Sequence, residues 1–439
     1  MSSLSVGFAG LAGILVLVAL RIPIGAALAL VAVLGLAQVA GWGAVMSLAG
    51  SLPYEFGANW ELSAVPMFLL MGALAYRSGL TAPLFLALRM WLRGLPGGLA
   101  VATNFACAIF AAACGSSVAT TVAMGRIAIP EMLKSGYNPG LAAAVCACAG
   151  TLGSMIPPSV MMILYGAFTG QSVAAIFLAG VFPGLLTAAV YAVMIVTRAV
   201  LDPTLAPMGR ETHTRREKFL ATRRAWPLPL LVVVVIGSIY GGVATPTEAG
   251  AFGAFCAFVL ALWAGAMSRK ILWEGITEAL HGTATIFFVA LGAVLLTRFM
   301  ALSGVPDFVA ELLSKNAVGP IGLIIAASVV YLILGCFLEP ISIMLLTLPI
   351  LIPALQKLSV NMVWFGILVV KLLEIGLITP PVGLNVFAAK ALVGDRISLE
   401  RIFAGVGWFL VCEAVVLSLL IAYPEISLYL PRSMGLMKF

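Results

Sequence analysis

Long apolar stretches separated by short polar breaks run along almost the whole chain. A helix needs about 20 consecutive apolar residues to cross the hydrocarbon core of a bilayer, and many of these stretches approach that length. The stretches of spanning length are residues 4–20, 23–40, 62–76, 139–168, 172–197, 226–241, 246–266, 283–298, 361–392 and 401–422. The pattern therefore predicts an all-α integral membrane protein with about ten spans.

Two further apolar regions, about 98–134 and about 318–356, are each interrupted near the middle. The interruptions at 114–117 and 339–342 leave halves of about 15–18 residues, which are too short to cross singly. We predict that each region is a re-entrant helical hairpin, which enters and leaves the membrane on one side. Two ordinary tilted spans are the alternative for each region.

Two of the spanning stretches contain adjacent prolines near the middle. The pairs are Pro157 with Pro158 in about 139–168, and Pro380 with Pro381 in about 361–392. Proline lacks an amide donor and clashes with the preceding turn, so we predict that both helices are broken there. In lipid, unwound backbone survives only where protein covers it or where it lines a cavity. A kinked, purely structural helix is the alternative for a single pair.

Prolines recur along the chain with one fixed separation, here called the repeat spacing. The pairs that share it are Pro23 and Pro246, Pro83 and Pro306, Pro130 and Pro353, Pro157 and Pro380, and Pro158 and Pro381. Gly153 and Gly376 have the same separation, so we infer two repeats, 1–199 and 226–439, joined by a linker at 200–225. Each repeat crosses the membrane an odd number of times in this arrangement, which predicts inverted topology of the second repeat.

The composition is that of a membrane protein, with 62% hydrophobic and 9% charged residues, against about 25% charged in soluble domains. The net charge of +7 comes mainly from Lys and Arg in the breaks between apolar stretches, where such charges set topology. We predict no nucleic-acid partner, a cytoplasmic linker and periplasmic chain termini. The sequence has two histidines and no GxxxxGK[ST], GxSxG or HExxH motif, so we predict no enzyme activity.

The two proline pairs supply the predicted chemistry, because a broken helix offers backbone charge of both signs inside the membrane. The half-helices that begin near Ser159 and Val382 present free amides to a substrate anion. The unwound carbonyls of 153–157 and 376–380 present oxygens to a hard cation such as sodium. We therefore predict a secondary transporter whose site lies between the two repeats.

Side chains near the interruptions extend this predicted site. Hydroxyls of Ser116, Ser117 and Thr379 can join a sodium shell, although back-bonding of each hydroxyl to its own helix is the alternative. Asn385 can hydrogen-bond a substrate, and Glu339 marks the tip of the second hairpin. The residues predicted to bind substrate are Ser116, Ser117, Ser159, Glu339, Ser342 and Asn385.

Three charged residues inside apolar stretches are interpreted separately. Lys371 and Glu374 lie three positions apart on a predicted helix and are expected to pair, either for structure or for ion coupling. Glu248 follows Pro246 at a predicted helix start, where a carboxylate meets free amides, so we expect it to cap the helix.

Several motifs, in order along the chain, resemble the large membrane subunit of tripartite ATP-independent periplasmic (TRAP) transporters, the DctM-like family. They are Gly-Ser-Ser-Val-Ala-Thr at 115–120, Ile-Pro-Glu-Met at 129–132, Gly-Ser-Met-Ile-Pro-Pro-Ser at 153–159, Ala-Thr-Pro-Thr-Glu-Ala at 244–249 and Thr-Pro-Pro-Val-Gly-Leu-Asn at 379–385. The resemblance covers essentially the whole chain.

The resemblance implies sodium-coupled, elevator-type uptake of a small carboxylate, such as a C4-dicarboxylate or sugar acid, across the bacterial inner membrane. It also implies two partners, a periplasmic substrate-binding protein and a small four-helix membrane subunit. Because the first apolar stretch begins close to Met1, we expect the small subunit to be a separate chain or absent. The sodium positions implied by the family are Ser116, Ser117, Gly153 and Pro157 in one repeat, and Gly335, Gly376, Thr379 and Pro380 in the other.

The main alternative is a stand-alone dicarboxylate carrier or exporter of similar architecture that works without a binding protein. An intramembrane enzyme is disfavoured because no nucleophile with an adjacent base is visible. For the transporter, we predict that the hairpins and broken helices move against a fixed scaffold. The predicted scaffold spans are near 23–40, 172–197, 246–266 and 401–422, and the predicted interfacial arm helices are 81–95 and 305–314.

Overall fold

The structure, a computed structural model, describes residues 2–208, 214–315 and 319–436. These residues form α-helices and two short 3-10 helices, η1 (Trp60–Ser63) and η2 (Gly394–Arg396), and contain no strand. The all-α prediction is confirmed within these ranges. Residue 318 of the second predicted hairpin and residues 209–213 of the linker lie outside them.

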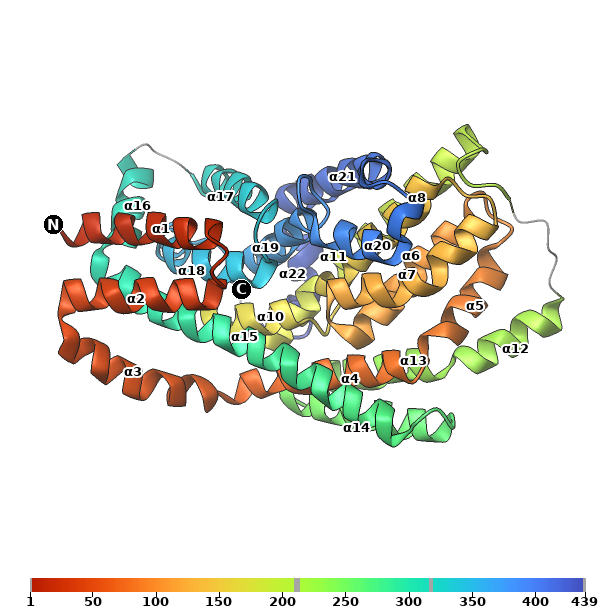
Figure 1. The fold of residues 1–439 in the computed structure, drawn as a ribbon, viewed down its shortest axis with the longest axis horizontal. Helices are drawn as coiled ribbons and strands as arrows, with labels where there is room; N and C mark the ends of the chain where they lie inside the picture. The colour runs from red at the N-terminus through yellow and green to blue at the C-terminus, as the bar shows by residue number, and fades with distance from the viewer. Residues whose placement is uncertain (1, 209–213, 316–318, 437–439) are drawn as a thin grey trace.

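The helices follow one another through two halves of the chain (Figure 1). The first half contains α1 (Ser3–Ala19), α2 (Ile24–Ala40), α3 (Trp42–Gly57), α4 (Ala64–Arg77), α5 (Thr81–Leu92), α6 (Gly98–Cys114), α7 (Ser117–Lys134), α8 (Pro139–Gly150), α9 (Leu152–Met155), α10 (Val160–Thr169) and α11 (Val173–Leu201). The linker contributes α12 (Arg215–Ala225). The second half contains α13 (Pro227–Tyr240), α14 (Pro246–Trp263), α15 (Arg269–Ser303), α16 (Val305–Lys315), α17 (Pro320–Gly335), α18 (Pro340–Lys357), α19 (Met362–Gly376), α20 (Leu384–Val393), α21 (Leu399–Ala422) and α22 (Glu425–Ser433).

Helix starts in the two halves recur with the repeat spacing of the prolines. The starts of α7 and α18, at Ser117 and Pro340, are separated by this spacing. The starts of α8 and α19, at Pro139 and Met362, are separated by it as well. The pairs α2 and α14, α5 and α16, α6 and α17, and α10 and α20 agree with it to within one position. The boundaries of the helices therefore follow the same period as the sequence.

One pair of equivalent segments differs in shape. In the first half, α3 is followed by η1 and α4 with a bend of 53°, whereas the second half has the single 35-residue helix α15. Asn59 accepts a hydrogen bond from the amide of Glu61 at 3.0 Å and starts a new helix, whereas Gly282, its counterpart at the repeat spacing, continues α15. The prediction of 283–298 captured only the apolar part of α15, and α3 was not predicted as a span.

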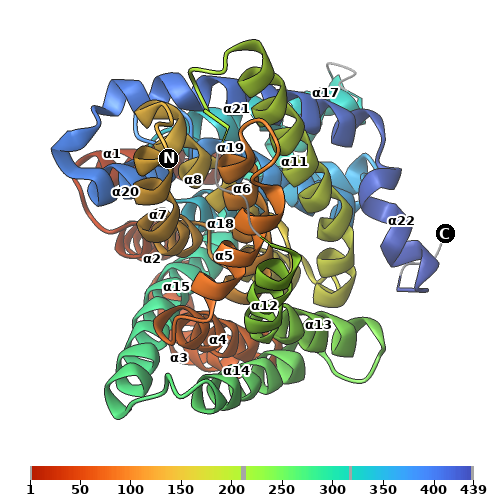
Figure 2. The ribbon, with the colours of Figure 1, turned by 90° about the vertical axis from the view of Figure 1, so that its right-hand side faces the viewer.

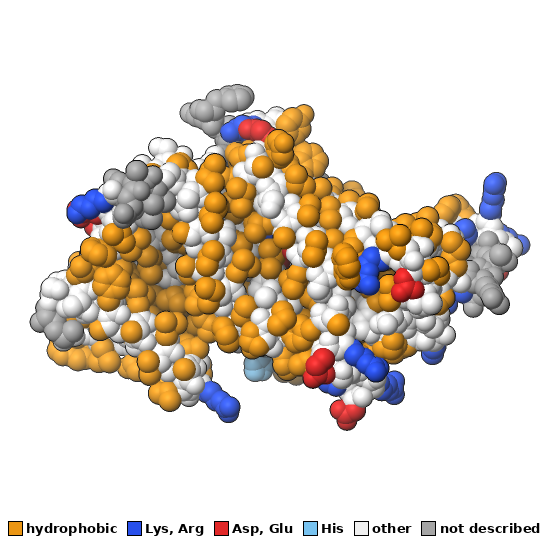
Figure 3. Space-filling model, turned by 90° about the horizontal axis from the view of Figure 1, so that it is seen from above, with side chains coloured by type: hydrophobic (Ala, Val, Ile, Leu, Met, Phe, Trp, Pro, Cys, Tyr) orange, Lys and Arg blue, Asp and Glu red, His pale blue; other side chains and the backbone are white. Residues whose placement is uncertain are grey.

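Among the described residues, six helical stretches are long and apolar enough to cross a membrane, one of them the broken stretch from α8 to α10, and eight spans result if each of two bent helix pairs is counted as one. The bent pairs are α3 with α4 and α12 with α13. Helices α1 and α2 have 17 residues each and are apolar but shorter. The all-helical membrane architecture is thus supported, and the total of about ten spans stays a prediction. Hydrophobic side chains cover most of the face in Figure 3, and Lys and Arg gather toward the end that carries the linker.

Two sets of helices pack side by side (Figures 1 and 2). In one set, α2 packs along α15, α14 packs along α4, and α4 also contacts α15. In the other set, α11 packs on α6, α19 and α21, and α21 packs on α8. The spans 172–197 and 401–422, predicted to be scaffold, therefore pack as α11 and α21 with the broken helices. Apolar length predicts that a segment spans the membrane but does not reveal its neighbours.

Two smaller expectations can be compared with the structure. The predicted arms 81–95 and 305–314 form α5, which packs on α6 and α12, and α16, which packs on α18. Glu248 caps α14 as predicted, because its carboxylate accepts a hydrogen bond from the Thr245 amide at 2.8 Å.

A fully buried cluster of charged side chains lies where α11, α19 and α21 meet. Lys371 Nζ lies 2.6 Å from Glu413 Oε2, 3.4 Å from Glu374 Oε2 and 3.0 Å from Thr187 Oγ1. The predicted pairing of Lys371 with Glu374 is confirmed, and Glu413, which accepts a hydrogen bond from Tyr191, was not predicted. Because a buried ion is stabilised only by its partners, the cluster fixes these three helices relative to one another.

Replacing Lys371 with Met is expected to lower the free energy of unfolding by about 3–5 kcal/mol, because two buried carboxylates lose their cation. Thermal or denaturant unfolding of the purified protein in detergent measures the change. Lys270→Met is the matched control, because its ammonium is 84% exposed and 3.9 Å from Glu274. That control should change stability by less than about 1 kcal/mol. Equal stability of the Lys371→Met variant and the wild-type protein would contradict the expected dependence of the cluster on its lysine.

Candidate functional site

The first hairpin reverses direction within two residues. Helix α6 ends at Cys114, Gly115 adopts a left-handed conformation with φ of 64°, and Ser116 is extended before α7 begins. A side chain is strained at this φ, so glycine permits the tight reversal. The predicted helix, turn and helix are present, and the depth of the tip in the membrane stays a prediction.

The second hairpin has a longer turn that ends in an acidic cap. Helix α17 ends at Gly335, and Glu339 precedes α18, where it accepts hydrogen bonds from the Ile341 amide at 3.1 Å, the Ser342 amide at 3.1 Å and Ser342 Oγ at 2.8 Å. Glu339 and Ser342 were both predicted to bind substrate, and in the structure they are hydrogen-bonded to each other. Because a carboxylate repels an anion, Glu339 is better suited to a cation than to an anionic substrate.

Both predicted helix breaks are present. The first covers residues 156–159 between α9 and α10, and the second covers residues 377–383 between α19 and α20. The Pro157-Pro158 and Pro380-Pro381 peptide bonds are both cis. The first proline pair is buried and the second is exposed, so the two breaks have different surroundings.

The first hairpin tip packs directly on the first break. A Cβ atom on Gly153 would lie 2.7 Å from the carbonyl oxygen of Ser116, and one on Gly115 would lie 2.9 Å from that of Pro158. These approaches are between backbones, which only glycine allows. Ser159 lies at the start of α10, and its buried hydroxyl has no hydrogen-bond partner among the described residues. The structure thus brings Ser116 and Gly153 together, beside the segment that contains Pro157 and Ser159.

The second hairpin and the second break also meet through glycine. A Cβ atom on Gly335 would lie 2.9 Å from Gly376 Cα. Thr379 Oγ1 donates a hydrogen bond to the carbonyl of Ile375 at 2.6 Å, so its proton is engaged by its own helix and its lone pairs are left to accept. Pro380 follows on the exposed side of this break.

Asn385 links the two halves of the chain. Its Nδ2 donates hydrogen bonds to Ser117 Oγ at 2.9 Å and to the carbonyl of Ala147 at 3.1 Å, and Ser117 Oγ donates to the carbonyl of Gly150 at 3.2 Å. The Oδ1 atom of Asn385 is buried without a hydrogen-bond partner among the described residues. Sequence reasoning assigned Asn385 to substrate and Ser117 to both substrate and sodium, and it missed the contact between their side chains. The repeat could not indicate this contact, because the residue that corresponds to Asn385 in the first half of the chain is Met162, which has no side-chain amide.

A cavity of about 110 Å³ lies between the two hairpin tips and the two breaks. Its polar lining comes from Ser116, Ser117, Ser154 and Glu339, and Leu377 belongs to the second break. A larger cavity of about 360 Å³ shares Ser116 with it and extends between α4 and α15. Leu69 of α4 lines both cavities and Ile286 of α15 lines the smaller one, so α4 and α15 contribute to the lining of the site.

Of the predicted site residues, only Ser116, Ser117 and Glu339 line this cavity, and most of its lining was not predicted, including the polar Ser154 and the apolar Leu69 and Ile286. Ser154 lies inside the segment 153–157, whose carbonyls were predicted to bind the cation, so its position was a usable signal. Leu69 and Ile286 are apolar residues in apolar stretches, so the sequence contained no signal for their placement at the cavity.

A family model matches residues 11–426 and is described as "Tripartite ATP-independent periplasmic transporter, DctM component". This chain belongs to the DctM family. A DctM-family chain is a transport protein and not an enzyme, and it is a multi-pass protein of the bacterial inner membrane. The match confirms the resemblance inferred from the motifs.

Similar proteins cover nearly the same length as this DctM-family chain. The C4-dicarboxylate TRAP transporter large permease protein DctM of Pseudomonas aeruginosa is 36% identical over 394 residues, which are 89% of this chain and 91% of that protein. The ectoine TRAP transporter large permease protein TeaC of Halomonas elongata is 32% identical, with 84% and 86% covered. The sialic acid TRAP transporter large permease protein SiaM of Vibrio cholerae is 29% identical, with 85% and 87% covered.

Two solved transporter structures share the fold of this DctM-family chain. The YdaH transporter of Alcanivorax borkumensis has a TM-score of 0.62 at 15% identity, with 88% of this chain and 89% of that chain covered. The MtrF efflux pump of Neisseria gonorrhoeae has a TM-score of 0.59 at 14% identity, with 88% and 85% covered. At these identities the likeness concerns the fold alone.

Replacing Gly153 with Ala is expected to push the first hairpin tip away from the first break, because the new Cβ would lie 2.7 Å from the Ser116 carbonyl oxygen. We expect a loss of stability of about 1–3 kcal/mol and a large loss of transport. Uptake by cells that express equal amounts of protein, together with the melting temperature, measures both effects. Gly50→Ala in α3 is the control, because a Cβ there meets nothing within 4 Å. Wild-type uptake by the Gly153→Ala variant would contradict the importance of this contact.

Proposed function

We propose that the chain performs sodium-coupled secondary active uptake of a small organic anion across the bacterial inner membrane. The observation that carries this proposal is the close backbone packing of each hairpin against its own broken helix, beside a cavity of about 110 Å³. Unwound backbone in an apolar protein is stable only where protein or a ligand satisfies it. Two such breaks beside one cavity are therefore suited to holding ions.

The proposed sodium ions are bound by backbone carbonyls and hydroxyls at the tips and breaks. Ser116, Ser117, Gly153 and Pro157 form the first proposed site. Gly335, Gly376, Thr379 and Pro380 form the second. Neutral oxygens are appropriate ligands for a weakly held, transported cation, which must also be released.

The proposed anion site uses helix starts. Helix α10 begins beside the first break, and its free amides carry partial positive charge. The buried hydroxyl of Ser159, which lacks a hydrogen-bond partner among the described residues, is available to the same ligand. Sodium bound nearby offsets the charge of the anion, which provides a physical basis for coupling.

We further propose that the two repeats have inverted topology and that transport follows an elevator mechanism. The recurrence of helix starts at the repeat spacing supports the repeats. The packing of α11 and α21 with the broken helices assigns them to the proposed moving part, in place of the scaffold role predicted from sequence. The helices α2 and α14 keep the scaffold role predicted for 23–40 and 246–266, and we propose that α4 and α15, which pack with them, belong to the same scaffold.

The substrate and partners are proposed from the family. Names of similar proteins specify C4-dicarboxylate and sialic acid, so we propose a carboxylate such as a C4-dicarboxylate or sugar acid as substrate. We propose a periplasmic substrate-binding protein and a small four-helix membrane subunit as partners, with both termini of this chain in the periplasm.

Reconstitution in proteoliposomes tests the proposed function. The purified chain, with the candidate small subunit and binding protein, should accumulate a radiolabelled carboxylate when an inward sodium gradient is imposed. Replacing sodium with potassium, or omitting the binding protein, should reduce uptake to background. Undiminished uptake by this chain alone would instead support the stand-alone carrier, and undiminished uptake without sodium would refute sodium coupling.

Thr379→Val tests the second sodium site, because valine keeps the side-chain shape and removes the oxygen. The concentration of sodium that gives half-maximal uptake should rise severalfold, with little change in the KM for substrate at saturating sodium. Thr379→Ser retains the oxygen and should restore the wild-type sodium dependence. If the valine variant has wild-type sodium dependence, the hydroxyl is not a sodium ligand.

A further inference from the structure

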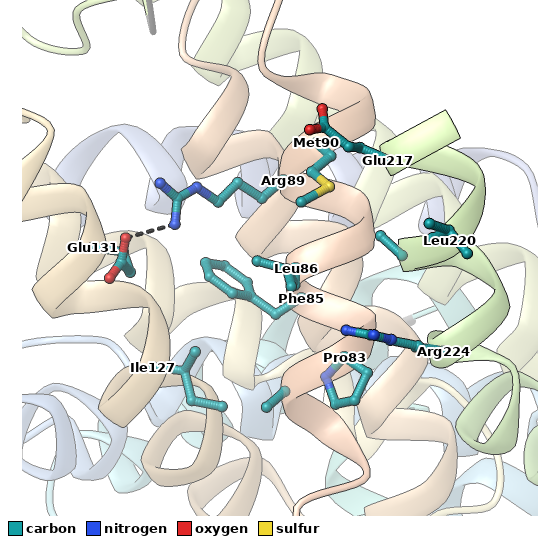
Figure 4. Close-up of a pocket in the computed structure, with 12 residues that line it drawn as sticks. Pro83, Phe85, Leu86, Arg89, Met90, Ile127, Glu131, Glu217, Leu220 and Arg224 are labelled. Carbon is teal, nitrogen blue, oxygen red and sulfur yellow. Dashed lines mark hydrogen bonds and ion pairs between the residues drawn. The ribbon is translucent and has the colours of Figure 1, made fainter. Parts of the chain in front are cut away.

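A third cavity lies away from the helix breaks, between the arm helix α5, the hairpin helix α7 and the linker helix α12 (Figure 4). Its volume is about 560 Å³. Most of its lining is apolar, with Pro83, Phe85 and Leu86 from α5, Ile127 from α7 and Leu220 from α12. Nothing in the proposed transport cycle uses this cavity.

The linker helix that forms one wall is strongly basic. The 11 residues of α12 include five basic ones, Arg215, Arg216, Lys218, Arg223 and Arg224. Helix α12 leads directly into α13, and the two form one of the bent helix pairs that could cross a membrane. A basic cluster immediately beside a span is the pattern of a segment that meets anionic lipid headgroups. The cavity therefore combines an apolar wall with a positive rim.

The acidic residues at the cavity are already engaged. Glu131 Oε2 lies 2.6 Å from Arg89 Nη1, and its other oxygen lies 3.6 Å from Lys134. Glu217 accepts a hydrogen bond from the Thr214 amide at 2.8 Å and so caps the start of α12. By contrast, Arg224 lines the cavity, and its guanidinium forms no ion pair or hydrogen bond with the described residues. Figure 4 places this side chain beside Pro83 at the cavity.

Two side-chain contacts hold α12 against α5, which form two of the cavity walls. Trp91 Nε1 of α5 donates a hydrogen bond to Thr222 Oγ1 of α12 at 2.9 Å. The ammonium of Lys218 lies 5.4 Å from the centre of the Trp91 ring, within cation–π range. These contacts fix α12 on α5, so the apolar space is bounded by a defined pair of helices.

We propose that this cavity binds an anionic phospholipid, with an acyl chain against the apolar wall and the headgroup phosphate on Arg224. Guanidinium recognises phosphate through charge-assisted hydrogen bonds. A free phosphate ion has no apolar group that could pack against the apolar wall. A zwitterionic lipid has no net negative charge that could pair with the basic helix. Because the walls come from the linker, an arm and a hairpin helix, the lipid adds an apolar contact to the Trp91–Thr222 hydrogen bond and the Arg89–Glu131 ion pair that already join these segments.

Native mass spectrometry of the purified full-length chain tests the proposal directly. In micelles with equal amounts of phosphatidylglycerol and phosphatidylcholine, the wild-type protein should retain one phosphatidylglycerol in clear preference. Arg224→Gln should weaken this retention about tenfold, as expected for the loss of hydrogen bonds to a charged group. Arg223→Gln removes the same charge from the adjacent position, outside the cavity lining, and should weaken retention no more than about twofold.

A second variant tests the apolar part of the site without changing charge. Leu86 lines the cavity and is 40% exposed, so Leu86→Trp should fill the cavity and lower phosphatidylglycerol retention while leaving the fold intact. Excess inorganic phosphate should fail to displace the lipid. Equal retention of the two lipids, equal effects of Arg223→Gln and Arg224→Gln, or displacement by phosphate alone would each overturn the proposal. All of these readouts are independent of transport.

Discussion

Backbone groups that leave a helix in an apolar interior must be covered by protein or bound by a ligand, and this constraint governs the centre of the structure. The first break is covered by the tip of the hairpin from its own repeat, whereas the proline pair of the second break is exposed and its flanking Gly376 packs against the end of α17. The covering is close because glycine stands at the contacts, as at Gly153 against Ser116 and Gly335 against Gly376. The cavity beside these contacts is small, and a ligand there meets the polar side chains of Ser116, Ser117, Ser154 and Glu339 among mostly apolar ones.

Buried charged side chains, like unwound backbone groups, must have partners inside the protein. Lys371 is surrounded by Glu413, Glu374 and Thr187, which belong to three helices. A buried ion with defined partners disfavours sliding of those helices past one another, since each displacement would strip the ion of a partner. The cluster thus gives α11, α19 and α21 the rigidity that a unit moving as one body needs.

Much of the architecture was predictable because proline and glycine act through local backbone geometry. The breaks at Pro157 and Pro380, the glycine turn at 115 and the repeat spacing all rest on such positions. Contacts between distant segments were not predictable in this way. The hydrogen bond from Asn385 to Ser117 joins residues that the repeat does not relate, and the place of Glu413 beside Lys371 depends on how α21 packs. Hydropathy likewise identified the apolar spans, but it did not predict that α11 and α21 pack against the broken helices.

The continuous helix α15 has a mechanical consequence. Its 35 residues extend over about 52 Å, well beyond the roughly 30 Å of hydrocarbon in a bilayer. Its first turns carry Glu274 and Glu278, both joined to Arg77 of α4, while its last turns run beside α2 and α18. A stiff rod of this kind is a rigid linkage, because it keeps its two ends at a fixed separation within the proposed scaffold. The bent pair α3 and α4 has a joint at the equivalent point, so the first half of the chain lacks that linkage.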